Sequence, residues 1–180
     1  MKIRTLFVLS ALLMGFISVS AKADIQTVPF VDVNRFLGDW YQISHVPLWF
    51  EGSSDCACAR QRLTTTPKAG VIGILNTCTK DDGSPYSIAG TATDDDASTN
   101  SKLTVSFEGV PFKGSYWIIG LDAQYRYAVV TDKGGDALYI LSRTPTLGKD
   151  LYRDAVAMAA RQVDTSKLAG TKQTGCNYPR

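Results

Sequence analysis

The stretch "FLGDWYQIS", residues 36–44, decides how the fold of this chain is interpreted. Its alternation predicts a β-strand in which Trp40, Gln42 and Ser44 share one face. A tryptophan that faces the same way as a glutamine and a serine is unusual for a fully dry core. This face is therefore either ordinary core or the wall of a roomier interior.

The first 23 residues have the features of a secretory signal peptide. A basic start, "MKIR", precedes the apolar run "TLFVLSALLMGFISVSA", and "AKA" at residues 21–23 offers small residues for cleavage. A membrane anchor is the alternative, disfavoured because the run is short and ends at a cleavage site. The first cysteine is Cys56, so no lipid anchor is expected at the cleavage point. We expect one domain over residues 24–180, exported and soluble in the periplasm or outside the cell.

The charge balance argues against a nucleic-acid partner. Cleavage removes Lys2, Arg4 and Lys22, which leaves 16 basic against 17 acidic residues and a net charge of −1. Without a basic excess, neither nucleic acid nor an anionic membrane surface is expected to bind.

Four cysteines, Cys56, Cys58, Cys78 and Cys176, predict two disulfides in an exported chain. A Cys56–Cys58 bridge is disfavoured because residues two apart in a strand lie near or beyond the usual bridging distance. Which of these two pairs with Cys78 and which with Cys176 stays open. No metal site and no cofactor are expected, because His45 is the sole histidine and no second close cysteine pair exists.

Short alternating runs separated by turn residues predict an all-β fold. The eight runs are 39–44, 56–66, 70–80, 86–94, 102–109, 114–122, 125–132 and 136–144. Their short connections favour an eight-stranded antiparallel up-and-down β-barrel. Helical spacing over residues 148–163 predicts one C-terminal α-helix packed outside it.

The connection at residues 45–55 is the exception, because it is long and aromatic. It carries Leu48, Trp49 and Phe50, which indicate a lid or a rim.

Three segments together resemble the lipocalin family. "FLGDWYQIS" resembles the Gly-x-Trp motif that opens the first lipocalin strand. "YRYAVVTDKGGDALYILSRTP" is similar to the last hairpin, with an arginine after the eighth strand, and "KLTVSFEGVPFKGSYWIIGLD" to the fifth and sixth strands. The resemblance covers about residues 30–175 and is closest to the branch of bacterial lipocalins and apolipoprotein D.

The resemblance implies a role for three residues at the closed end. Trp40 would close the barrel with Arg143 across its indole, and Gly38 would leave room for the close approach. We interpret these three as structural. The resemblance also implies the disulfides Cys56–Cys78 and Cys58–Cys176, with the exchanged pairing as the alternative.

Parity and the resemblance together imply a ligand-binding wall. Alternate residues of a strand share a face, so Leu141 and Tyr139 point inward if Arg143 does. By the same rule, Gln42 points inward with Trp40. The resemblance adds pairs on three further strands, and the rim loop adds two aromatic residues: Val105, Phe107, Tyr116, Ile118, Ala128, Val130, Trp49 and Phe50. The small Ala128 favours an open cavity over a barrel filled by its own side chains.

The leading functional interpretation is a non-enzymatic carrier of a small hydrophobic ligand, such as a fatty acid or a lysophospholipid. A lipid-modifying enzyme is the first alternative, weakened because no Ser–His–Asp arrangement or close carboxylate pair can be assembled around His45. A protein-interaction module that uses the 45–55 loop is the second. Each of these three interpretations is compatible with a homodimer through the open barrel end.

Overall fold

The computed structural model describes residues 24–46 and 56–178. Within them the chain forms two α-helices and nine strands, which follow one another in this order: α1 (Val33–Phe36), β1 (Gly38–Val46), β2 (Ala57–Thr65), β3 (Val71–Thr79), β4 (Pro85–Asp94), β5 (Lys102–Phe107), β6 (Gly114–Leu121), β7 (Tyr127–Thr131), β8 (Leu138–Ser142), α2 (Lys149–Ala159) and β9 (Ala169–Gly170).

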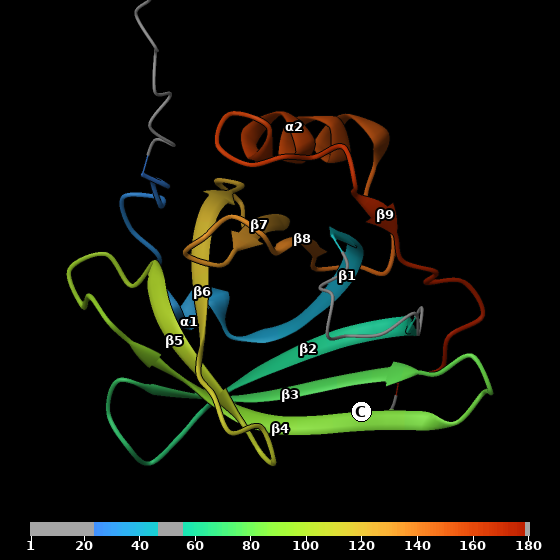
Figure 1. Cartoon of the computed structure of the whole chain (residues 1–180), viewed down its shortest axis with the longest axis horizontal. Coiled ribbons are helices and arrows are strands. Elements are labelled where there is room, and N and C mark those ends of the chain that lie inside the picture. The colour runs from blue at the N-terminus through green and yellow to red at the C-terminus, as the bar shows by residue number, and fades with distance from the viewer. Residues whose placement is uncertain (1–23, 47–55, 179–180) are drawn as a thin grey trace, which may run out of the picture.

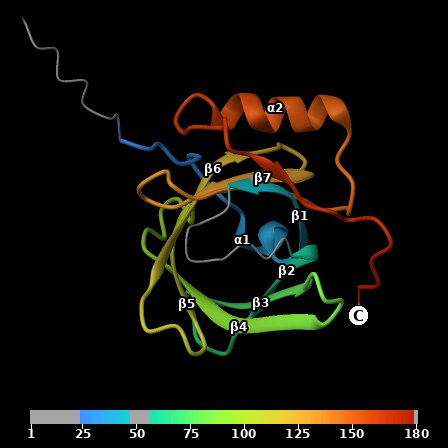
Figure 2. The same ribbon diagram turned by 45° about the vertical axis from the view of Figure 1, so that its right-hand side comes forward.

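The strands β1 to β8 close into an antiparallel barrel. Each strand from β2 to β7 pairs with the next, and β1 pairs with both β8 and β2. Figure 2 looks nearly along the barrel and shows this ring of strands with α1 in its middle. The predicted eight-stranded up-and-down barrel with an outer helix is therefore confirmed.

Two hydrophobic clusters lie on the two sides of the barrel wall. The inner cluster fills the barrel and includes Trp40, Ile118 and Leu141. The outer cluster lies between the wall and α2, which crosses β7 and β8 in Figure 1. Ala155 and Ala159 of α2 are completely buried there, because only small side chains allow the helix to approach the sheet closely.

A β-bulge in β1 changes one prediction about its faces. Gln42 lies opposite Leu141 of the inner cluster, but after the bulge Ser44 lies opposite Ile140 of the outer cluster. The expectation that Ser44 shares a face with Trp40 and Gln42 is wrong, because one extra residue inverts the alternation. His45, opposite Tyr139, takes the inward position instead.

The short helix α1 is an element that the sequence analysis did not predict. The Asp32 carboxylate caps it by accepting hydrogen bonds from the backbone N–H groups of Asn34 (3.0 Å) and Arg35 (3.3 Å). The buried Phe36 at its end contacts Trp40, with the ring centres 5.0 Å apart. The helix thereby covers the closed end of the barrel.

The C-terminal segment occupies the place where β1 and β2 separate. β1 pairs with β2 only from Gly38 to Tyr41, and beyond this it pairs with β9. The chain continues along the gap, where the Thr171 N–H donates to the Ile43 carbonyl (2.9 Å) and the Cys58 N–H donates to the Lys172 carbonyl (2.8 Å). The tail thus supplies backbone hydrogen bonds that the two strands no longer exchange.

Both disulfides that the resemblance implies are present. Cys56 pairs with Cys78 and Cys58 pairs with Cys176, each with Cα atoms 5.5 Å apart. The first links β3 to the chain just before β2, and the second fastens the tail to β2.

Within residues 24–46 and 56–178, no helix has the length and the apolar composition that a membrane span needs.

Candidate functional site

The closed end of the barrel is built around Trp40 and Arg143. The Arg143 guanidinium lies 3.7 Å from the centre of the Trp40 ring, and the fully buried indole donates its N–H to the Phe36 carbonyl (2.8 Å). A cation over a desolvated indole is stabilising by about 2 kcal/mol. The two residues form the floor of the barrel.

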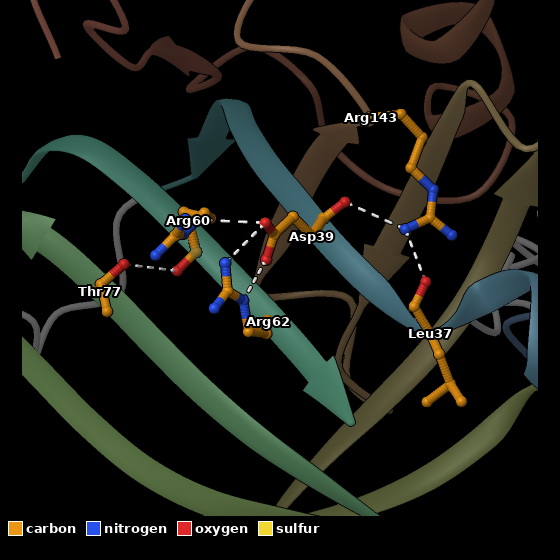
Figure 3. Close-up of polar contacts among 6 residues, drawn as sticks. All are labelled: Leu37, Asp39, Arg60, Arg62, Thr77 and Arg143. Carbon is orange, nitrogen blue, oxygen red and sulfur yellow. Dashed lines mark hydrogen bonds and ion pairs between the residues drawn. The ribbon is translucent and has the colours of Figure 1, made fainter. Parts of the chain in front are cut away.

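Hydrogen bonds from Arg143 attach this floor to α1 and β1. Its Nη1 donates to the carbonyls of Leu37 (2.9 Å) and Asp39 (3.0 Å), as Figure 3 shows, and its Nη2 donates to the Arg35 carbonyl. Burial lowers the pKa of Arg143, although a guanidinium starts so far above neutrality that it stays charged. The positive charge is therefore directed at main-chain oxygens at the floor.

Gly38 is located where this arrangement needs a glycine. Its φ is +97°, and an added Cβ would lie 3.4 Å from Arg143 Nη1. The backbone conformation excludes most side chains, and the contact leaves little room for one.

Eight residues predicted to bind ligand lie together on the inner wall. They belong to, or pack against, the same cluster as Trp40: Val105, Phe107, Tyr116, Ile118, Ala128, Val130, Tyr139 and Leu141. Their side chains come from four consecutive strands, so β5 to β8 present one apolar and aromatic surface to the interior. Trp49 and Phe50 lie outside the described residues.

Gln42, the remaining predicted residue, lies where β1, β8 and the tail meet. Its Nε2 donates to Thr171 Oγ1 (2.9 Å), and Thr171 Oγ1 is 3.4 Å from His45 Nδ1. The His45 ring stacks nearly parallel to Tyr139, with ring centres 6.4 Å apart. Polar groups therefore gather above the apolar wall, toward the end of β1 that is opposite the floor.

Two inward polar residues were not predicted. Gln61 of β2 lies opposite Trp40, and Asn76 of β3 lies opposite Gln61. Tyr116 donates its hydroxyl hydrogen to Gln61 Oε1 (2.9 Å), and Gln61 Nε2 donates to Asn76 Oδ1 (3.3 Å). A register shift between Ala57 and Arg60 hides the inward face of β2 from simple alternation, so only the strand pairing shows it.

A narrow apolar void lies next to Tyr116. No part of it is wide enough for a water molecule. Residues from five strands line it: Leu63, Ile72, Ile74, Ala92, Leu103 and Tyr116. The part of the barrel between these side chains is nearly closed in this conformation.

The outer side of the β1–β2 seam carries an ion-pair network, drawn in Figure 3. Asp39 accepts two hydrogen bonds from Arg62 (2.7 and 3.0 Å), and Arg60 Nη1 lies 3.7 Å from the same carboxylate. The hydrogen bonds from Arg62 lower the pKa of Asp39, and the charge of Arg60 adds to this effect. Tyr178 of the tail covers Arg60, whose guanidinium lies 5.7 Å from its ring centre.

Within residues 24–46 and 56–178, no cluster of three or more His, Cys, Asp or Glu side chains has an arrangement that could hold a metal ion.

Comparison with known proteins agrees with this geometry. Residues 31–173 match the family described as the lipocalin-like domain. The chain belongs to the lipocalin family. This assignment confirms the resemblance inferred from the Gly-x-Trp strand and the last hairpin.

Individual lipocalins match over most of the chain. Outer membrane lipoprotein Blc of Escherichia coli (strain K12) is 36% identical over 149 residues, which cover 80% of each protein. Apolipoprotein D of Bos taurus is 29% identical over 81% of this chain and 78% of its own length. Among solved structures, lobster apocrustacyanin A1 superimposes with a TM-score of 0.65 and 19% identity over 79% of each chain, which shows the shared lipocalin fold.

Proposed function

We propose that this lipocalin is an exported carrier, not an enzyme, which holds a fatty acid or a lysophospholipid in its barrel. The observation that carries the proposal is the inner wall, where eight apolar and aromatic side chains of β5 to β8 face one interior. A concave apolar surface with a few polar groups is the usual character of a small-molecule site.

The distribution of polarity suggests how such a ligand would lie. Gln42, His45 and Thr171 provide hydrogen-bonding groups away from the floor, whereas Arg143 at the floor donates to main-chain carbonyls. A charged headgroup would therefore stay near the open end, and the acyl chain would enter first.

The energetics of apolar burial are sufficient for such binding. Each buried methylene contributes about 0.8 kcal/mol, and micromolar affinity corresponds to about 8 kcal/mol, so roughly ten methylenes reach it. Because the void beside Tyr116 is narrow, a chain that reaches the floor must displace side chains such as Leu63 and Ile74. This rearrangement lowers the net affinity.

Export is part of the same proposal. Residues 1–23 would act as the signal peptide, and the product would be soluble in the periplasm or outside the cell. The first cysteine of the chain, Cys56, is bonded to Cys78, so we propose that it carries no lipid. In this respect the protein would differ from the relative named as an outer membrane lipoprotein.

Native mass spectrometry of the exported protein, combined with lipid extraction, tests the proposal. We expect a co-purifying fatty acid or lysolipid that is lost in Tyr139→Asp, because the new carboxylate would lie on the inner wall. Phe30→Asp is the matched control, since this aromatic side chain is 57% exposed. A bare polypeptide that also fails to bind a fluorescent fatty acid would contradict the proposal and direct attention to the 45–55 loop.

A further inference from the structure

A row of three uncharged polar side chains crosses the inner wall near the floor. It is formed by Tyr116 of β6, Gln61 of β2 and Asn76 of β3, joined by hydrogen bonds of 2.9 and 3.3 Å. These strands are not all neighbours in the barrel, so the Tyr116–Gln61 bond spans its interior. We call these three residues the polar row.

The position of the polar row is low in the barrel. Gln61 lies directly opposite the floor residue Trp40 on the neighbouring strand. On the closed side of the row, Leu63 lies opposite Gly38, and Leu63 and Tyr116 line the narrow void, which admits no water molecule. A ligand that enters through the open end without displacing these side chains would therefore end at the polar row.

The polar row has hydrogen-bonding capacity left over. Its two bonds use the Tyr116 hydrogen, both ends of the Gln61 amide and the oxygen of Asn76. This leaves the Asn76 amide hydrogens and the lone pairs of the Tyr116 oxygen, which have no hydrogen-bond partner among residues 24–46 and 56–178. Rotating the amides exchanges donor for acceptor but still leaves one end of Asn76 available.

The charge state of the polar row restricts what it can bind. Burial raises the pKa of the Tyr116 phenol, so the hydroxyl is neutral. Arg143, the cation of the floor, donates to carbonyl oxygens. The charge of Arg143 also reaches Tyr116 and lowers its pKa in part, but its guanidinium hydrogens are directed at main-chain carbonyls. A carboxylate placed at the row would lose its hydration and compete with these carbonyls, whereas a hydroxyl or a carbonyl group needs only the donors and acceptors that are available.

We propose that the polar row is a subsite for a neutral hydroxyl or carbonyl group at the end of the ligand that reaches the barrel floor. This inference rests on the proposed function, because it needs a ligand in the barrel. It adds a preference for ligands with a polar group at the buried end. An apolar wall alone would not produce this preference, since a purely apolar pocket disfavours a hydroxyl there.

Calorimetric titration with palmitic acid and ω-hydroxypalmitic acid tests the proposal. The two ligands share a headgroup and differ only by a hydroxyl at the buried end. We expect the wild-type protein to bind the hydroxy acid at least as tightly as palmitic acid. In Asn76→Leu and Tyr116→Phe the preference should shift toward palmitic acid by about tenfold, because the hydroxyl loses a partner.

Tyr127→Phe is the matched control. It also removes a buried tyrosine hydroxyl, but this one lies on the outer side of the wall, 3.7 Å from Met158 Sδ. We expect it to leave the ratio of the two affinities unchanged. Thermal unfolding identifies any variant that does not fold. If Asn76→Leu does not fold, Tyr116→Phe, which removes a single atom, still tests the subsite.

Failure of the subsite and failure of the carrier function give different titration results. If palmitic acid binds but the wild-type protein disfavours the hydroxy acid as strongly as the variants do, the subsite is overturned and the carrier function stands. If neither acid binds to the folded wild-type protein, both the carrier function and the subsite are overturned.

Discussion

At the scale of single residues, Arg143 connects more of the molecule than any local pattern indicates. Its guanidinium lies over Trp40 and donates to carbonyls of Leu37 and Asp39, so one side chain ties the end of β8 to the start of β1. A flat cation with several fixed donors is needed for this geometry, and a lysine could not reproduce it.

Replacing Arg143 should therefore lower the stability of the fold. We expect Arg143→Met to lower the free energy of unfolding by about 3 kcal/mol, because it removes the cation–π contact and takes the hydrogen-bond donor away from the partly buried carbonyls of Leu37 and Asp39. Urea unfolding measures the change. Arg153→Met is the control, since that side chain is 73% exposed and should change stability by less than about 0.5 kcal/mol. Equal effects of the two substitutions would contradict the structural role of Arg143.

The Asp39 carboxylate makes a contribution to stability that depends on pH. Its pKa is lowered in the folded state by the hydrogen bonds from Arg62, so its stabilising effect is complete above the unfolded pKa of about 3.9 and is lost as the pH falls through the folded value. We expect Asp39→Asn to be less stable than wild type at neutral pH and the difference to shrink below about pH 4. Chemical unfolding across this range measures it, and a difference that stays constant with pH would refute the assignment.

At the scale of elements, α2 depends on small residues at its contact with the barrel. Ala155 and Ala159 are completely buried, and the Met158 sulfur lies where a Cβ on Gly120 of β6 would be only 3.1 Å away. The helix and the sheet are therefore in close contact, with little space for larger side chains.

We expect Ala155→Leu to cost about 2 kcal/mol of stability, because the added atoms would push α2 away from β7 and β8. Ala157→Leu is the matched control, with the same change on the exposed face of the same helix and an effect within about 0.5 kcal/mol. Thermal unfolding of the two variants provides the comparison. An equally stable Ala155→Leu would show that the helix is loosely packed.

At the scale of the whole molecule, the C-terminal tail completes the barrel where β1 and β2 part. Besides its backbone hydrogen bonds, the Gln173 side chain donates to the carbonyls of Gln42 and Ala59 (both 2.8 Å), which bridges the two strands. Tyr178 then packs on Tyr41 with ring centres 4.7 Å apart. In Figure 1 the tail runs from β9 along this side of the barrel.

The two disulfides should differ in what they contribute. Cys58–Cys176 joins residues 118 apart and Cys56–Cys78 joins residues 22 apart. In the chain-entropy description these loops correspond to about 5 and about 3 kcal/mol. We expect the double substitution Cys58→Ala/Cys176→Ala to destabilise the protein more than Cys56→Ala/Cys78→Ala in urea unfolding. The opposite order would mean that the tail adds little to the barrel.

Several features of the fold were predictable from local patterns. Alternation indicated all eight barrel strands and helical spacing indicated α2, whereas the closed end at Trp40 and Arg143 was implied by the family resemblance. These signals are readable because the period of a strand or a helix is repeated along the chain itself. The inward positions of β5 to β8 followed from the same alternation and the resemblance.

Other features depended on contacts between distant segments. The bulge that turns Ser44 outward, the polar row and the path of the tail involve strand register or partners far along the chain. A single bulge reverses the face to which every later residue of the strand points, and the local sequence pattern does not predict it. The alternating residues thus specified a barrel with an apolar interior, whereas the pairing of strands in three dimensions placed Gln61 and Asn76 beside Tyr116 inside it.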